Sequence, residues 1–177
     1  VVRYSKDSLR GAERGEDPHW PAAIPFQPQA VIRVARLNCD ANWNAEPLAW
    51  ERFRVLLGNR ERIKLEVRDG VRPADLNVNR PAVVVLSGTG TLKLSEADQA
   101  ALKQYVAGGG TLLVEAIGGS SEFAVSARGV LEDMYGRGKI VPLGSSHAMF
   151  VLPGRVIQRV EYTREAKMRQ GRIVIPN

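Results

Sequence analysis

Residues 82–90 read Ala-Val-Val-Val-Leu-Ser-Gly-Thr-Gly, and this stretch decides the fold. Its first five residues form an apolar run of strand length, which is typical of a strand buried on both faces of a parallel sheet. Residues 87–90 then break the run with small, turn-forming side chains. Ser95 predicts the N-cap of a helix that runs through Val106 and ends at the glycines of 108–110. A buried strand that leads through a glycine turn into a helix is the repeating unit of an α/β protein.

The same alternation of strand and helix extends in both directions from this stretch. Right-handed crossovers between parallel strands place helices on both faces of the sheet, so we expect a mostly parallel α/β sheet over residues 29–177. The further predicted strands are 30–37, 63–67, 111–114, 140–141, 156–162 and 173–175. A helix is predicted at 48–57, with Gly58 as its stop, and one helical turn at 72–76. Residues 118–121 lead into a further predicted helix that carries Phe123, Val130, Leu131 and Met134.

Residues 1–28 differ from the rest of the chain. Prolines recur at short intervals among charged and aromatic residues, and proline removes backbone donors and favours extended chain. We therefore predict an irregular, proline-containing arm. Either it covers the surface of its own domain, or it reaches a partner chain.

Composition narrows the classes of function. The 177 residues carry a net charge of +6, but the basic residues often stand beside acids, which argues against nucleic acid as a partner. The longest apolar runs are strand-sized, so no membrane span is expected in this chain. The single cysteine, Cys39, excludes an internal disulfide and does not settle the compartment. The chain begins at Val1, which indicates a fragment or the removal of an upstream segment such as a signal peptide or an anchor.

Topology predicts where a ligand would bind. In an open parallel sheet, ligands lie beyond the carboxyl ends of the strands, so the loops that follow three of the strands should meet at one rim. The binding candidates in those loops are Asp40, Asn42, Trp43, Gly88, Thr89, Gly90, Glu115, Gly118 and Gly119.

The same rim offers several kinds of chemistry, each with a structural alternative. Glu115, Ser121 and His147 are the catalytic candidates, because a serine, a histidine and an acid can form a triad. Ser120 or Ser121 could instead cap the following helix. Cys39 could act as a nucleophile or be an inert loop residue. We predict no cofactor and no metal.

Two further features of the rim also have two readings. Asp40, Glu115 and His147 offer oxygen and nitrogen ligands but lack the tight spacing of a metal site, and Asp40 could hydrogen-bond its own loop. The glycine turns could cradle a phosphate or simply serve the tight turns.

Several loop motifs together resemble a known bacterial family, the domain-of-unknown-function family 4159. The motifs are Arg36-Leu37-x-x-Asp40-x-x-Trp43, Gly88-x-Gly90, Leu94-Ser95-x-x-Asp98, residues 108–113, residues 119–123 and residues 146–150. The resemblance covers about residues 30 to 177. It implies a flavodoxin-like sheet similar to that of the class I glutamine amidotransferases, and an association with the cell envelope.

The chain departs from the family and from true amidotransferases at the rim. Thr89 stands where family members often carry His, and Ala116 follows Glu115 where they often carry a second acid. Amidotransferases place a nucleophilic cysteine on the turn after the strand at 111–114, and this stretch has none. The family pattern also continues past Asn177, so a truncated domain is expected.

These expectations favour a non-catalytic, amidotransferase-like domain that acts in binding or assembly, in the periplasm or associated with the envelope. Its partner would be a protein, bound through residues 1–28 or an exposed sheet edge. The alternative is a hydrolase of an ester, amide or glycan that uses the crevice at the carboxyl ends of the strands, with Glu115, His147 or Ser121.

Overall fold

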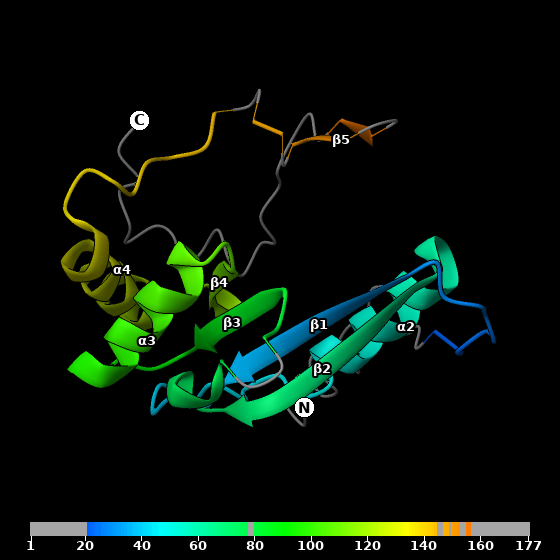
Figure 1. The fold of residues 1–177 in the computed structure, drawn as a ribbon, viewed down its shortest axis with the longest axis horizontal. Coiled ribbons are helices and arrows are strands. Elements are labelled where there is room, and N and C mark those ends of the chain that lie inside the picture. Colours follow the sequence, from blue (N-terminus) through cyan, green and yellow to red (C-terminus); the bar gives the residue numbers. More distant parts are fainter. Residues whose placement is uncertain (1–20, 78–79, 145–146, 149, 153–154, 157–177) are drawn as a thin grey trace, which may run out of the picture.

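A parallel sheet of four strands organises the described part of the chain (Figure 1). The computed structural model describes residues 21–77, 80–144, 147–148, 150–152 and 155–156. The order across the sheet is β2 (Ile63–Val71), β1 (Ala30–Leu37), β3 (Val83–Gly88) and β4 (Thr111–Ala116), with every neighbouring pair parallel. A short antiparallel pair, β5 (Val151–Leu152) with β6 (Arg155–Val156), lies apart from this sheet. The α/β, flavodoxin-like fold expected from the sequence is confirmed.

In the described part of the chain, three helices connect and follow the strands. They are α2 (Ala49–Glu61), α3 (Glu96–Ala107) and α4 (Ser121–Tyr135), with 3-10 turns η1 (Pro73–Asp75) and η2 (Ile117–Gly119). The predicted cap at Ser95 is confirmed, since its hydroxyl accepts a hydrogen bond from the backbone N–H of Asp98 at 3.2 Å. Among the described residues, no helix is both long and apolar enough to cross a bilayer.

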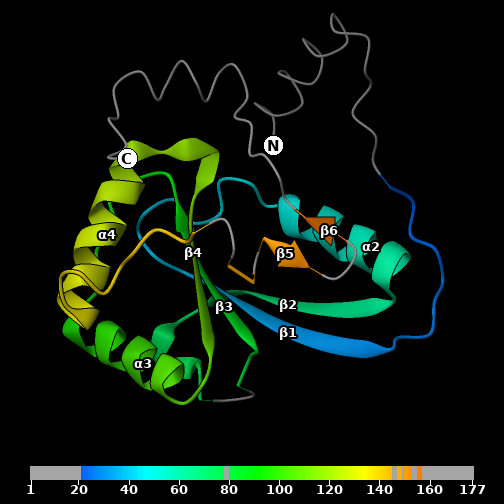
Figure 2. The same cartoon turned by 90° about the horizontal axis from the view of Figure 1, so that it is seen from above.

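The helices divide between the two faces of the sheet, as Figure 2 shows. On one face, α2 packs over β1 and β2, where Val34 and Leu65 form a small core with Trp50. On the other face, α3 and α4 pack over β3 and β4. Leu102 from α3 and Phe123 from α4 belong to the larger core there, and both are fully buried. Alternate residues of the strands therefore enter two different cores.

Several predicted boundaries are wrong by a few residues. The helix predicted at 48–57 begins at Ala49 and continues past Gly58 to Glu61. Gly58 is no stop because it is buried under the arm: a Cβ there would lie 2.6 Å from Cε1 of Phe26. The helix ends where Arg62 takes the left-handed conformation, with φ of 53°. Strands β2 and β3 run past their predicted ends because they stay paired with β1 and β4.

The strand predicted at 140–141 is wrong. Both residues lie in irregular chain after Gly136 and Gly138, whose positive φ angles turn the backbone away from strand geometry. Val156, the first residue of the strand predicted at 156–162, is the last residue of β6. It pairs with Val151 in the short antiparallel pair and not with the main sheet. Residues 157–162 and 173–175 lie outside the described residues, as do residues 1–20 of the arm.

The described part of the arm, residues 21–28, contains neither helix nor strand and lies on its own domain. The Asn59 amide of α2 holds it at two points. Its Nδ2 donates to the carbonyl of Ala22 at 2.8 Å, and its Oδ1 accepts from the N–H of Ile24 at 2.9 Å. Together with the contact between Phe26 and Gly58, these bonds make this segment a cover for α2.

Strand β3 ends at a glycine that lets two loops approach closely. Gly88 is buried, and a Cβ at this position would collide with the carbonyl oxygen of Ala41. The added Cβ would also lie 2.8 Å from Cδ2 of Phe123. Backbone cannot move aside as a flexible side chain can, so only glycine fits here.

We expect Gly88→Ala to lower the free energy of unfolding by about 2 kcal/mol, because the added methyl overpacks a rigid site. Gly129→Ala in α4 is the matched control, since nothing lies within 4 Å of a Cβ at that position. There, alanine should raise the free energy of unfolding by about 0.5–1 kcal/mol through helix propensity. Urea unfolding of the three proteins measures both effects. Equal stability of wild type and Gly88→Ala would contradict the packing described here.

Candidate functional site

Three loops meet at the carboxyl ends of the strands, as the sequence predicts. The carbonyl oxygen of Ala41, in the loop after β1, accepts hydrogen bonds from the N–H groups of Thr89 and Gly90 at 2.9 and 3.0 Å. Nδ2 of Asn42 donates to Oγ1 of Thr89 at 2.7 Å. The hydroxyl of Ser120, after β4, donates to the carbonyl of Thr89 at 2.7 Å. The loop after β3 is therefore bonded to both of its neighbours.

Helix α4 holds the next residues of the same loop. Oε1 of Glu122 accepts hydrogen bonds from the backbone N–H of Thr91 at 2.9 Å and from its hydroxyl at 2.5 Å. Oγ of Ser126 accepts from the N–H of Leu92 at 2.9 Å. These bonds fix the loop after β3 against the first turns of α4.

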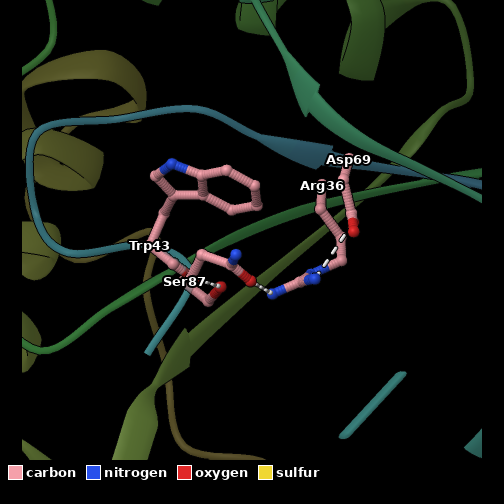
Figure 3. Close-up of polar contacts among 5 residues, drawn as sticks. Arg36, Trp43, Asp69 and Ser87 are labelled. Carbon is pink, nitrogen blue, oxygen red and sulfur yellow. Dashed lines mark hydrogen bonds and ion pairs between the residues drawn. The ribbon is translucent and has the colours of Figure 1, made fainter. Parts of the chain in front are cut away.

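A buried arginine lies just below this rim, on the face of the sheet that α2 covers. Arg36 of β1 is only 2% exposed, and Figure 3 shows its side chain reaching toward Asp69 with Trp43 and Ser87 nearby. Its Nη1 donates to Oδ1 of Asp69 at 3.0 Å, and its Nη2 donates to Oδ1 of Asn44 at 3.2 Å. The guanidinium carbon lies 5.2 Å from the ring centre of Trp43, within cation–π distance.

Burial of this charge requires the partners that surround it. An ionised side chain loses its hydration on burial and is tolerated only when it is paired and hydrogen-bonded. Asp69 comes from the end of β2, whereas Trp43 and Asn44 come from the loop after β1. Arg36 therefore ties that loop to the neighbouring strand. Its Nε is buried and has no hydrogen-bond partner among the described residues, so the pairing is incomplete.

Sequence reasoning did not assign Arg36 to the site, although a signal was present. Ile32, Val34 and Arg36 alternate along β1 and so point to the same face of the sheet. A charged residue in an alternating apolar series indicates a buried charge that needs a partner. Asp69 and Asn44, which supply the partners, carry no such local signal.

Two carboxylates of the rim have no hydrogen bond or ion pair with any residue that the structure describes. Asp40 is exposed in the loop after β1, so the bond to its own loop considered from the sequence does not form there. Glu115 is exposed on β4, opposite Ser87 in the sheet register. Gly118 and Gly119 are also exposed, with φ of 63° and 70°, as a tight turn from strand to helix requires. Their role in ligand binding stays a prediction.

The serines at the start of α4 have separate positions. The hydroxyl of Ser120 accepts a hydrogen bond from the N–H of Phe123 at 3.3 Å, which makes Ser120 the N-cap of the helix. Ser121 is exposed in the first turn of α4. His147 is exposed as well, and its backbone N–H donates to the carbonyl of Gly144 at 2.9 Å. The catalytic roles of Ser121, His147 and Glu115 stay predictions.

Cys39 is a buried thiol directly after β1. Its Sγ lies 3.6 Å from the carbonyl oxygen of Ser87, to which it donates a hydrogen bond. Burial raises the pKa of the Cys39 thiol, and the neighbouring charge of Asp40 raises it further, while a backbone hydrogen bond at Ala41 acts in the opposite direction. A raised pKa keeps the sulfur protonated at neutral pH, which disfavours the thiolate that nucleophilic catalysis requires.

A metal site does not form from the candidates in the described part of the chain. No group of three or more histidine, cysteine, aspartate or glutamate side chains there lies close enough to hold an ion. Asp40, Glu115 and His147 therefore do not gather as a ligand set.

The pair between Arg36 and Asp69 should contribute measurably to stability. We expect Asp69→Ala to lower the free energy of unfolding by about 2 kcal/mol, because it leaves the buried guanidinium of Arg36 without its carboxylate. This loss is smaller than for a fully buried ion pair because the Asp69 side chain is 53% exposed. Asp75→Ala is the control, since it breaks an ion pair whose arginine, Arg72, is 75% exposed and stays hydrated without its partner. It should leave the urea midpoint unchanged. Equal losses in the two variants would contradict a special role for Arg36.

The buried thiol predicts how stability depends on pH. The pKa of Cys39 is raised in the folded state, so above its ordinary value of 9.0 the unfolded thiol loses its proton before the folded one. The free energy of unfolding should therefore fall as the pH rises above that value. Cys39→Ser, which does not titrate in this range, should lack this part of the fall. Urea unfolding between pH 7.5 and 10 tests this, and parallel curves for the two proteins would refute it.

Comparison with known proteins supports the resemblance seen in the motifs. The family model described as "Domain of unknown function (DUF4159)" matches residues 32–171. Neither the curated proteins nor the solved structures include a match to this chain. The matched residues include nearly all of the four-stranded sheet, helices α2, α3 and α4, and the rim, which is most of the chain. The chain therefore belongs to the family of domains of unknown function DUF4159.

Proposed function

We propose that this chain is a non-catalytic domain, similar to the class I glutamine amidotransferases, that acts in binding or assembly near the bacterial envelope. The strand order β2-β1-β3-β4, with helices on both faces, supports the likeness in fold. The envelope location follows from the resemblance to the family. The rim at the carboxyl ends of the strands is the proposed binding surface.

The observation that carries the proposal is the state of the hydroxyl at the turn after β4, where an amidotransferase would place its nucleophile. The hydroxyl of Ser120 donates a hydrogen bond to the carbonyl of Thr89 and accepts one from the backbone N–H of Phe123. A nucleophilic hydroxyl must instead give its proton to a general base. The thiol of Cys39 is buried, with a raised pKa. The hydroxyl of Ser120 and the thiol of Cys39 therefore serve the fold.

The exposed groups of the rim support binding. Asp40 and Glu115 offer carboxylates that are not used by the described residues. Asn42 is exposed and is held in place by its bond to Thr89. Polar groups fixed by a rigid scaffold lose little conformational freedom when they bind, which favours affinity.

The edge of the sheet supports a protein as the partner. In the described part of the chain, β4 pairs with β3 alone, so its other side is an open edge. Leu113, near the middle of β4, is 41% exposed. Natural proteins usually cover such edges, and a strand from a partner is one way to do so.

The proposal predicts the outcome of a turnover assay. The purified wild-type chain should release ammonia from glutamine, or product from nitrophenyl esters and amides, no faster than the variants do. The variants are Glu115→Gln, Ser121→Ala and His147→Ala. Turnover by the wild type that one of these substitutions abolishes would overturn the proposal in favour of the hydrolase.

A second readout tests the binding half in the source organism. A photo-crosslinking amino acid at Asn42 on the rim, or at Leu113 on the edge, should give one discrete protein adduct. The same probe at Gln104, which is exposed near the C-terminal end of α3, is the control and should give none. No adduct at either test position, or the same adduct at Gln104, would contradict a specific binding surface.

A further inference from the structure

The two edges of the sheet differ in how they are protected. In the described part of the chain, β2 and β4 are the outer strands, and each pairs on one side only. Natural proteins guard such edges with charged side chains and with irregular pairing. β2 has both protections. It carries Lys64, Arg68 and Asp69, all exposed, and its pairing with β1 shifts in register between Ala35 and Leu37.

The β4 edge has neither protection. The strand reads Thr-Leu-Leu-Val-Glu-Ala, so it contains no proline and no basic residue. It pairs with β3 through six consecutive residues without a shift in register. This regular pairing keeps the strand extended, so the backbone groups on its other side form a regular row. Among the described residues, nothing guards β4 against a further strand.

The side chains of β4 alternate between a covered face and an open face. The even-numbered residues, from Leu112 to Ala116, pack against the larger core under α3 and α4. The alternate residues Thr111, Leu113 and Glu115 point to the opposite face and are exposed. On that face α2 lies over β1 and β2 (Figure 2). Leu113 is therefore an exposed apolar side chain in the middle of an open strand.

Helix α4 has an apolar side next to this edge. Glu122 and Ser126 bond to the loop after β3, so they mark the side of α4 that faces β3. Helical periodicity places Ala124, Leu131 and Tyr135 on the other side, toward the edge of the sheet. The core that α4 covers includes none of these three among the described residues, and Ala124 and Tyr135 are exposed. We call these three residues the apolar stripe of α4.

The β4 strand is complementary to a second copy of itself. Two identical strands related by a twofold axis perpendicular to the sheet run antiparallel. With the axis at Leu113, this residue faces its own copy, and Thr111 faces Glu115 of the partner subunit. Leucine then meets leucine at the centre, a hydroxyl meets a carboxylate at each end, and the two carboxylates stay apart. An axis at Val114 would instead place Leu113 opposite Glu115, and an axis at Leu112 would leave Glu115 beyond the partner strand.

We infer that the β4 edge binds a second copy of this chain, in an antiparallel dimer centred on Leu113 whose two sheets join as one. The twofold axis places the apolar stripes of both α4 helices on the same face of the joined sheet, where they face each other. The pairing uses both β4 edges, so assembly stops at two copies. The inference rests on the proposed function, because it names the partner of an edge already proposed to bind a protein.

Sedimentation velocity of the full chain over a series of concentrations tests this inference. The wild type should pass from monomer to dimer in the micromolar range. Leu113→Glu should stay monomeric, because it places two carboxylates opposite each other at the centre. Val31→Glu is the matched control and should dimerise as the wild type does. Val31 is also an exposed aliphatic strand residue, 49% exposed against 41% for Leu113, but it lies in β1, which has a strand on both sides.

Two substitutions at Thr111 test the register. Thr111→Lys adds an opposite charge across from Glu115 of the partner subunit, twice by symmetry, and should tighten the dimer about fivefold. Thr111→Glu adds a like charge at the same place and should weaken the dimer by a similar factor. Thr111 is exposed, so neither change enters the core. Circular dichroism checks that each variant folds, and the Thr111 pair decides the outcome if Leu113→Glu does not fold.

Several results would overturn the inference. They are a wild type that stays monomeric at about 300 µM, unchanged dimerisation of Leu113→Glu, and equal weakening by Val31→Glu. Effects of the same sign from both Thr111 variants would overturn the register. A crosslink from position 113 within one chain would show that the chain covers its own edge, which also excludes the dimer. A monomer that crosslinks a different protein from this position would overturn the dimer but support the proposed function.

Discussion

The buried guanidinium of Arg36 is the constraint on which the arrangement of the rim depends. A charge placed inside the sheet face needs partners, and the strand that carries it cannot supply them. Asp69 comes from the end of β2, and Asn44 and Trp43 come from the loop after β1. The loop therefore folds back toward Arg36, while its residues Cys39, Ala41 and Trp43 pack against the larger core. The buried Nε of Arg36 has no hydrogen-bond partner among the residues that the structure describes, so this requirement is met only in part.

The rest of the rim follows from the position of that loop. In an open α/β sheet of this order, the loops after β1 and β3 usually diverge and leave a crevice between them. Here Ala41 accepts hydrogen bonds from Thr89 and Gly90, and Gly88 allows the two backbones to come together. Some residues that the sequence marks as ligand-binding candidates thus also hold the loops together. The exposed polar groups at the same rim, such as Asp40 and Glu115, are not engaged in this way.

Local pattern was sufficient to predict most elements, but their ends depended on distant contacts. Alternation and apolar runs predicted the four strands of the sheet, and Ser95 marked its helix correctly. Gly58 is a reasonable helix stop when only its neighbours are considered, yet the helix passes through it because Phe26 of the arm packs there. The apolar pair at 140–141 has strand propensity but no neighbouring strand to pair with it among the described residues.

The sequence by itself determined the order of strands and helices, and with it the edge of the sheet where the loops converge. The hydrophobic period along each segment is a local property, and parallel strands with right-handed crossovers allow few arrangements. Only the tertiary structure decided that Arg36 is buried against Asp69 and that the thiol of Cys39 is enclosed. Burial and pairing depend on which residues distant in the chain come together, and the local pattern of a sequence does not record these contacts.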